Sequence, residues 1–167
     1  MVTVQTHAYI GIDPGLTGAL AHLSPAGIIR ARDLPVLQTR KGGKNTLDVH
    51  ATVSLLHYLA DVSGPDLTVI LEEVNSMPKQ GVVSTFTFGR TFGQLEGVIV
   101  GLGLKLHMVR PAVWKKVMGV SADKDGARLA ASRAFPEAAD QWSRKKDHGR
   151  AEAALLALYG ARYLRRG

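Results

Sequence analysis

Two short apolar runs in this chain each end on a carboxylate. Residues 8–12 read Ala-Tyr-Ile-Gly-Ile and are followed by Asp13, and residues 67–71 read Leu-Thr-Val-Ile-Leu and are followed by Glu72. Runs of this length and composition indicate β-strands, the second of them buried on both faces. A carboxylate that leaves the interior of a sheet costs free energy unless a cation or a hydrogen-bond donor meets it. If the two strands are neighbours, Asp13 and Glu72 open at one end of the sheet.

The order of the remaining patterns predicts a mixed α/β fold. Further strands are predicted at residues 18–23, 27–31 and 104–109, and helices at residues 46–62, 83–102, 124–135 and 148–163, with a short helix that begins at Pro111. Thr46 is the expected N-cap of the first helix, and the polar segment 34–46 is an expected connection. Five strands in this order with helices form a mixed sheet flanked by helices. The 167 residues suffice for one such domain, spanning residues 1–167.

Glycines recur every four residues on one side of the predicted helix 83–102, at Gly89, Gly93, Gly97 and Gly101. Each glycine inside a helix costs about 1 kcal/mol relative to alanine. The row therefore suggests that another helix packs closely against it, either within the fold or across a dimer interface. The alternative is incidental glycine in a helix that is well supported elsewhere.

The formal net charge of +7 is unevenly distributed. Residues 1–75 carry a net charge of −2 and residues 76–167 carry +9. A basic half favours a polyanionic partner such as nucleic acid, although a basic protein without such a partner has the same composition. The chain has no apolar run of membrane-spanning length, no secretory pattern at its N-terminus and no cysteine. We therefore expect a cytoplasmic protein with no membrane partner.

A third group of polar residues, Asp147-His148-Gly149-Arg150-Ala151-Glu152, begins the last predicted helix. His148 and Glu152 are four residues apart and share a helix face, whereas Asp147 could reach the same site only from the cap position. Carboxylates from three separate elements form a hard oxygen site that suits Mg²⁺ or Mn²⁺. Two such ions can activate water and stabilise the leaving oxygen of a phosphodiester. Taken singly, Asp13 could be a turn residue and Glu72 a solvated strand end.

At these residues the chain resembles the RuvC family of Holliday junction resolvases. The resemblance rests, in this order, on Gly11-Ile12-Asp13-Pro14-Gly15, Leu71-Glu72-Glu73-Val74 and Glu152-Ala153-Ala154-Leu155. The segments Met77-Pro78-Lys79-Gln80-Gly81, Phe88-Gly89 and Asp147-His148-Gly149-Arg150 are most similar to compact RuvC-like proteins of bacteriophages and prophages. The resemblance implies a ribonuclease H-like fold, a homodimer, a divalent metal ion and paired cuts across a four-way DNA junction.

The resemblance also assigns candidate site residues. Asp13, Glu72 and Glu152 match the family's catalytic, metal-binding acids, and Glu73 should point to the other face of its strand unless the register shifts by one. The family's fourth ligand lies three residues before the last acid, where this chain has Gly149. Asp147, or alternatively His148, would then supply the fourth ligand, or the site has only three ligands.

Basic residues near the same loops are expected to hold DNA phosphates; they are Lys79, Arg90, Lys115, Lys116, Lys124, Lys145, Lys146 and Arg150. Phe86 could stack on bases and Met77 could wedge into a junction step. Trp114 fits core packing better than base stacking.

Three other interpretations compete with a junction resolvase. Actin-like and sugar-kinase proteins share an Asp-bearing first strand, but they need two such domains and this chain has room for one. A non-catalytic DNA-binding module would not need the acids. A less selective nuclease on the same ribonuclease H-like fold would need them, and cutting of a four-way junction compared with a hybrid duplex would distinguish it.

Overall fold

The computed structural model describes residues 6–38, 45–73, 81–121 and 123–164, with the side chain of Lys124 outside that description. Five strands form one sheet in the order β3-β2-β1-β6-β7. The antiparallel part comprises β1 (Ala8–Asp13), β2 (Ala19–Leu23) and β3 (Ile29–Asp33), while β6 (Leu67–Glu72) and β7 (Lys105–Val109) run parallel to β1. The predicted mixed five-stranded sheet is confirmed.

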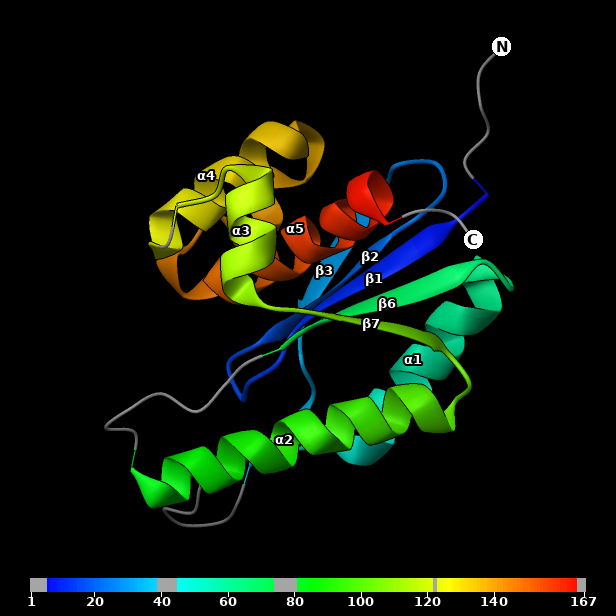
Figure 1. The fold of residues 1–167 in the computed structure, drawn as a ribbon, viewed down its shortest axis with the longest axis vertical. Helices are drawn as coiled ribbons and strands as arrows, with labels where there is room; N and C mark the ends of the chain where they lie inside the picture. Colours follow the sequence, from blue (N-terminus) through cyan, green and yellow to red (C-terminus); the bar gives the residue numbers. More distant parts are fainter. Residues whose placement is uncertain (1–5, 39–44, 74–80, 122, 165–167) are drawn as a thin grey trace.

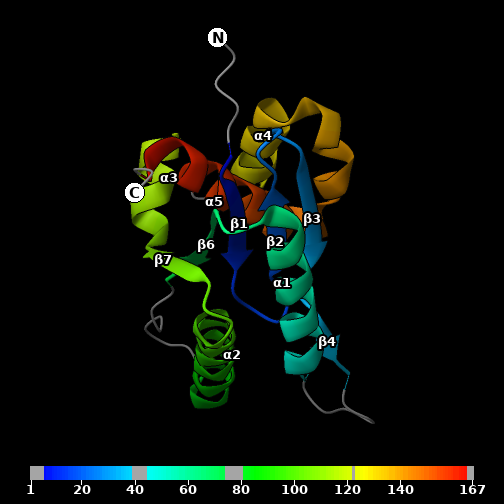
Figure 2. The ribbon, with the colours of Figure 1, turned by 90° about the vertical axis from the view of Figure 1, so that its right-hand side faces the viewer.

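Helices cover both faces of this sheet (Figures 1 and 2). On one face lie α3 (Pro111–Met118), α4 (Lys124–Ala134) and α5 (His148–Tyr163), and on the other lie α1 (Val49–Ser63) and α2 (Val82–Gly101). Two 3₁₀ helices, Pro136–Trp142 and Lys145–Asp147, connect α4 to α5. None of the helices in the described part of the chain is long and apolar enough to cross a membrane.

Side chains of β1 and β6 alternate between two separate apolar cores. Tyr9 and Ile70 belong to the core under α5, whereas Ile10, Ile12 and Leu71 belong to the core shared with α1 and α2. This alternation is a consequence of the two-residue period of a strand. Both strands are therefore buried on both faces, which the sequence predicts for β6 only.

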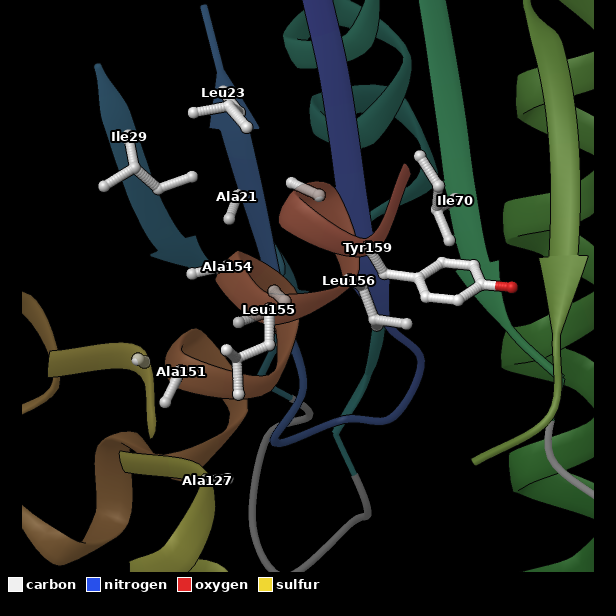
Figure 3. Close-up of a cluster of buried hydrophobic side chains, with 14 of the residues drawn as sticks. Ala21, Leu23, Ile29, Ile70, Ala127, Ala151, Ala154, Leu155, Leu156 and Tyr159 are labelled. Atoms are coloured by element: carbon white, nitrogen blue, oxygen red, sulfur yellow. The ribbon is translucent and has the colours of Figure 1, made fainter. Parts of the chain in front are cut away.

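Helix α5 packs directly on β1 and runs antiparallel to it. A Cβ atom on Gly11 would overlap the carbonyl oxygen of Ala153, and a Cβ atom on Gly160 would come within 2.7 Å of the Tyr9 ring. Figure 3 shows α5 surrounded by side chains of the neighbouring strands and of α4, including Ala21, Leu23, Ile29, Ile70 and Ala127. The close approach fixes the N-terminal turn of α5 at the carboxyl ends of β1 and β6.

The first helix begins later than the sequence predicts. Asp48, not Thr46, is the N-cap of α1, and its carboxylate accepts a hydrogen bond of 3.0 Å from the amide of Ala51. Thr46 and Leu47 instead form β5 (Thr46–Leu47), which pairs with β4 (Val36–Leu37) in a small second sheet. Local sequence does not distinguish the two capping residues, because both residue types accept hydrogen bonds at a helix start.

The four glycines of α2 point away from every other described part of the chain. A Cβ atom added at Gly89, Gly93, Gly97 or Gly101 would meet nothing within 4 Å. Close packing of this row against another described helix of the same chain is therefore wrong. A contact with a second copy stays a prediction.

Candidate active site

Asp13 and Glu72 lie side by side at the carboxyl end of the sheet. Ile12 pairs with Leu71 in the parallel register, and each acid is the next residue on its strand. Asp13 lies on the same face of β1 as Gly11 and Tyr9, and Glu72 lies on the same face of β6 as Ile70. Because this face meets α5, both carboxylates face α5. The fold thus brings two of the predicted site residues to one place on one face.

Glu152 joins them from the second turn of α5. Its side chain is 14% exposed. Glu152 lies about one turn of α5 beyond Gly149. A Cβ atom added at Gly149 would come 3.1 Å from Oδ2 of Asp13. The first turn of α5 therefore lies against Asp13, and Gly149 leaves room for that carboxylate.

Burial and mutual repulsion raise the proton affinity of the two strand-end acids. Burial raises the pKa of Asp13 well above its usual 3.8, and the nearby charges of Glu152 and Glu72 raise it further, while Lys115 opposes them. The pKa of Glu72 is also raised from 4.5, first by burial and then by Glu152, against the opposing hydrogen bond from Trp114. Burial, reinforced by the neighbouring carboxylates, therefore disfavours the ionised form of both acids when no cation is bound.

Helix α3 supplies two donors to these acids from adjacent residues. The fully buried Trp114 donates a hydrogen bond of 2.8 Å from Nε1 to Oε1 of Glu72. The ammonium of Lys115 lies 2.6 Å from Oε1 of Glu152. Trp114 is thus a core residue, as predicted, but its polar atom also belongs to the acidic site.

The structure does not bring Asp147 into the same group. Asp147 is buried, and its two oxygens accept hydrogen bonds of 2.8 and 2.9 Å from the guanidinium of Arg144. These bonds lower the pKa of Asp147, and none of the three acids is among the charges that shift it. The neighbouring His148 differs, because its Nδ1 is buried without a hydrogen-bond partner in the described part of the chain.

Comparison with solved structures identifies the architecture around these acids. A structure of Thermus thermophilus RuvC matches with a TM-score of 0.56 and 20% identity, over 93% of this chain and 95% of that chain. Thermus thermophilus RuvC in complex with a Holliday junction substrate matches with the same TM-score, 17% identity and the same coverage. The chain has the fold of RuvC. Yeast mitochondrial Holliday junction resolvase Ydc2 also matches, with a TM-score of 0.47 and 14% identity, over 91% of this chain and 78% of that chain.

Sequence comparisons add nothing to this RuvC-like architecture. No protein-family model matches the chain, and no curated protein matches it either. The likeness to the RuvC fold and the strand order of this chain both agree with the ribonuclease H-like fold predicted from the sequence.

Glu73 lies beside the acidic group of Asp13, Glu72 and Glu152 rather than in it. It follows the last residue of β6, is partly exposed and pairs with Arg110 at 3.7 Å. Because strand residues alternate in direction, Glu73 cannot join Glu72 on the face that meets α5 without a shift of register.

The predicted DNA-binding residues fall into different settings around this RuvC-like fold. Arg90, Lys116, Lys145 and Lys146 are exposed. Arg150 is bound to Asp33 through contacts of 2.7 and 2.9 Å, and Lys115 is bound to Glu152. Lys79 and Met77 lie outside the described residues, as does the side chain of Lys124. Phe86 is 71% exposed on α2, as base stacking would require.

The residue types in the acidic group fit a hard divalent cation. Three neighbouring carboxylates provide oxygen ligands, and the chain has no cysteine. As placed, however, no three histidine, aspartate or glutamate side chains of the described residues are arranged to hold one metal ion together. Glu152 is instead directed to Lys115, so an ion would have to change that contact.

Sequence analysis missed two ion pairs that organise this end of the RuvC-like fold. Arg144 holds Asp147, and Asp33 holds Arg150 across 117 residues of sequence. The three-residue spacing of Arg144 and Asp147 is a signal that could have predicted the first pair. The second depends on the packing of α5 beside β3 and has no local signal.

Proposed function

We propose that this protein is a divalent-metal-dependent endonuclease that resolves four-way or otherwise branched DNA junctions by paired cuts. The observation that carries the proposal is the convergence of Asp13, Glu72 and Glu152 at one end of a RuvC-like sheet. Neighbouring carboxylates at strand ends in a basic protein offer the oxygen ligands that metal-assisted phosphodiester hydrolysis needs.

Each acid has a defined role in this proposal. Asp13, Glu72 and Glu152 would hold Mg²⁺ or Mn²⁺, and when bound the ion supplies an activated water and a counter-charge for the leaving oxygen. Trp114 keeps Glu72 oriented through its hydrogen bond, so that one carboxylate oxygen is fixed before any ligand arrives. The apolar core beneath Asp13 limits the access of water from the sheet side.

The surroundings of the candidate fourth ligands favour His148 over Asp147. Arg144 already occupies both oxygens of Asp147, and moving that carboxylate to a metal ion would break both of these contacts. His148 has a buried nitrogen that lacks a partner among the described residues, and it lies one helical turn before Glu152. We therefore propose His148 as the additional ligand.

Two further elements of the proposal concern DNA and assembly. Exposed Lys116, Lys145 and Lys146 lie on elements next to the first turn of α5 and would contact phosphates. Two cuts need two active sites, and the open glycine row of α2 offers a self-complementary surface for a homodimer. The resemblance to phage and prophage proteins makes a branched phage genome one natural substrate of such an enzyme.

The decisive experiment compares a four-way junction with a linear duplex of the same sequence across a salt series. Phosphate contacts weaken with salt for both substrates, because counterion release does not depend on branching. A preference for the junction that survives at every salt concentration, followed by paired nicks on opposing strands after Mn²⁺ is added, is the expected result. Asp13→Asn serves as the control that binds but does not cut.

Three outcomes would contradict the resolvase proposal. Equal affinity for both substrates at all salt concentrations would remove junction selectivity. Single unpaired nicks on duplex, or cleavage of an RNA–DNA hybrid in preference to the junction, would favour a less selective ribonuclease H-like nuclease. Junction binding without any metal-dependent cleavage would favour a non-catalytic DNA-binding module.

A further inference from the structure

Two adjacent residues of α3 connect the acids of the site into one network. Trp114 donates to Glu72, and Lys115 contacts Glu152 at 2.6 Å. The ammonium of Lys115 also lies 5.3 Å from the centroid of the Trp114 ring, within the range of a cation–π contact. The Lys115 side chain is 19% exposed, so its charge is held inside the site rather than in solvent.

The position of Lys115 answers a charge problem that the acids create. Three carboxylates repel one another at this end of the sheet, and Lys115 is the cation whose charge favours ionised Asp13 and ionised Glu72. Buried like charges are tolerated only when an opposite charge offsets them. Lys115 is thus the counter-ion of the whole group, although the acid that it contacts directly is Glu152.

The same contact engages one of the candidate metal ligands. Glu152 is directed to the ammonium, and as placed, no three acidic or histidine side chains in the described ranges are arranged to hold one ion. Lys115 contacts one oxygen of Glu152, and a divalent ion at the same carboxylate would satisfy the same negative charge and repel the ammonium. Binding of one must therefore weaken binding of the other.

We propose that Lys115 is a built-in competitor of the metal ion, which offsets part of the charge of the acidic group when no divalent ion is bound and is released from Glu152 when one binds. The released ammonium would then be available to a DNA phosphate beside the same acids. This inference rests on the proposed metal site. It changes the role predicted for Lys115, from a simple phosphate contact to a cation that exchanges between two anions.

The test is the affinity of the full chain for Mn²⁺, measured by titration calorimetry at pH 8 without DNA. Lys115→Met keeps the length of the side chain and removes the charge, and it should bind Mn²⁺ about tenfold more tightly than the wild type, a difference of about 1.4 kcal/mol. Lys116→Met removes the same charge from the exposed neighbouring residue and should leave the affinity nearly unchanged.

Lys115→Arg provides a second variant if Lys115→Met fails to fold. A guanidinium can bind Glu152 through two nitrogens and should compete more strongly, so Mn²⁺ affinity should fall. Unchanged or weaker binding in folded Lys115→Met, or tighter binding in Lys115→Arg, would overturn the competition. If the wild type does not bind Mn²⁺, or if Asp13→Asn does not abolish that binding, the proposed function itself is contradicted.

Discussion

The buried indole of Trp114 donates a hydrogen bond of 2.8 Å to Oε1 of Glu72, and this bond joins the core of the protein to its acidic site. Because the tryptophan ring has no exposed surface, its position is set by packing and not by the acid. Glu72 is therefore held by a donor that cannot follow it if it moves.

Trp114→Phe tests that restraint. Phenylalanine keeps most of the apolar contact area but cannot donate, so Glu72 loses one fixed oxygen. Outer-shell donors of this kind typically contribute about 10-fold to 100-fold in metal affinity or activity. We expect a loss in this range in Mn²⁺ affinity, with the circular dichroism spectrum unchanged. A variant with wild-type affinity would mean that the hydrogen bond has no role beyond packing.

Asp13→Asn and Glu72→Gln should each reduce junction cleavage by more than about 100-fold while junction binding persists. Removal of a negative charge does not weaken contact with phosphates, so binding and catalysis should separate. Glu73→Gln is the matched control, since Glu73 adjoins Glu72 in sequence but pairs with Arg110. Gel-shift and single-turnover cleavage assays on the same junction measure both quantities. Near-normal turnover in either acid variant would remove that residue from the metal site.

Without divalent ions, the stability of the protein should decrease as pH rises toward and through the raised pKa of Asp13. The folded state binds this proton more tightly than the unfolded chain, whose aspartates titrate near 3.8. The favourable contribution is thus complete below the pKa of the unfolded chain and is lost as pH rises through the pKa of the folded state. The amide in Asp13→Asn carries no charge, so the free energy of unfolding of this variant should exceed that of the wild type by an amount that grows with pH.

Chemical denaturation in EDTA between about pH 4 and pH 8 measures this difference. Asp66→Asn, at an exposed position just before β6, is the control and should show no such trend. A constant difference between Asp13→Asn and the wild type would contradict the placement of Asp13 among buried acids.

Gly93→Leu should affect assembly and spare the fold. No described atom outside α2 lies within 4 Å of a Cβ at this position, and leucine favours a helix over glycine by roughly 1 kcal/mol. Sedimentation velocity should show loss of a dimer, while thermal unfolding stays cooperative. His57→Leu adds the same side chain to the exposed face of α1 and should not change the mass. If Gly93→Leu sediments as a dimer, this face is not the interface.

His148→Ala should weaken Mn²⁺ binding by about tenfold or more, because it removes a nitrogen ligand from the proposed site. Asp147→Asn should instead reduce the stability of the protein, because it breaks the paired contacts with Arg144. Its affinity for Mn²⁺ should stay largely unchanged. Calorimetric titration and chemical denaturation of both variants separate the two effects. The reverse pattern would restore Asp147 as the fourth ligand.

The parts of this structure that follow from local patterns were predictable, and those that depend on distant packing were not. The apolar runs before Asp13 and Glu72 predict two strands, and the register shows that these strands are neighbours, as the grouping of their acids requires. By contrast, Lys115 and Glu152 are 37 residues apart, and their contact depends on how α3 sits beside α5. The predicted N-cap of α1, Thr46, is two residues before the observed one, Asp48. Both residues can cap a helix, and only the pairing of β4 with β5 decides between them.

Helix α5 contacts β1, β2, β3, β6 and α4, and it carries Glu152 in its second turn. The backbone amides of this helix can be released only when the sheet beneath it separates, which amounts to unfolding the domain. Hydrogen exchange around Glu152 should therefore report global rather than local opening. Opening the acidic end of the sheet therefore costs as much free energy as unfolding the whole domain. A destabilising core mutation far from the site would lower activity by reducing the fraction of folded molecules.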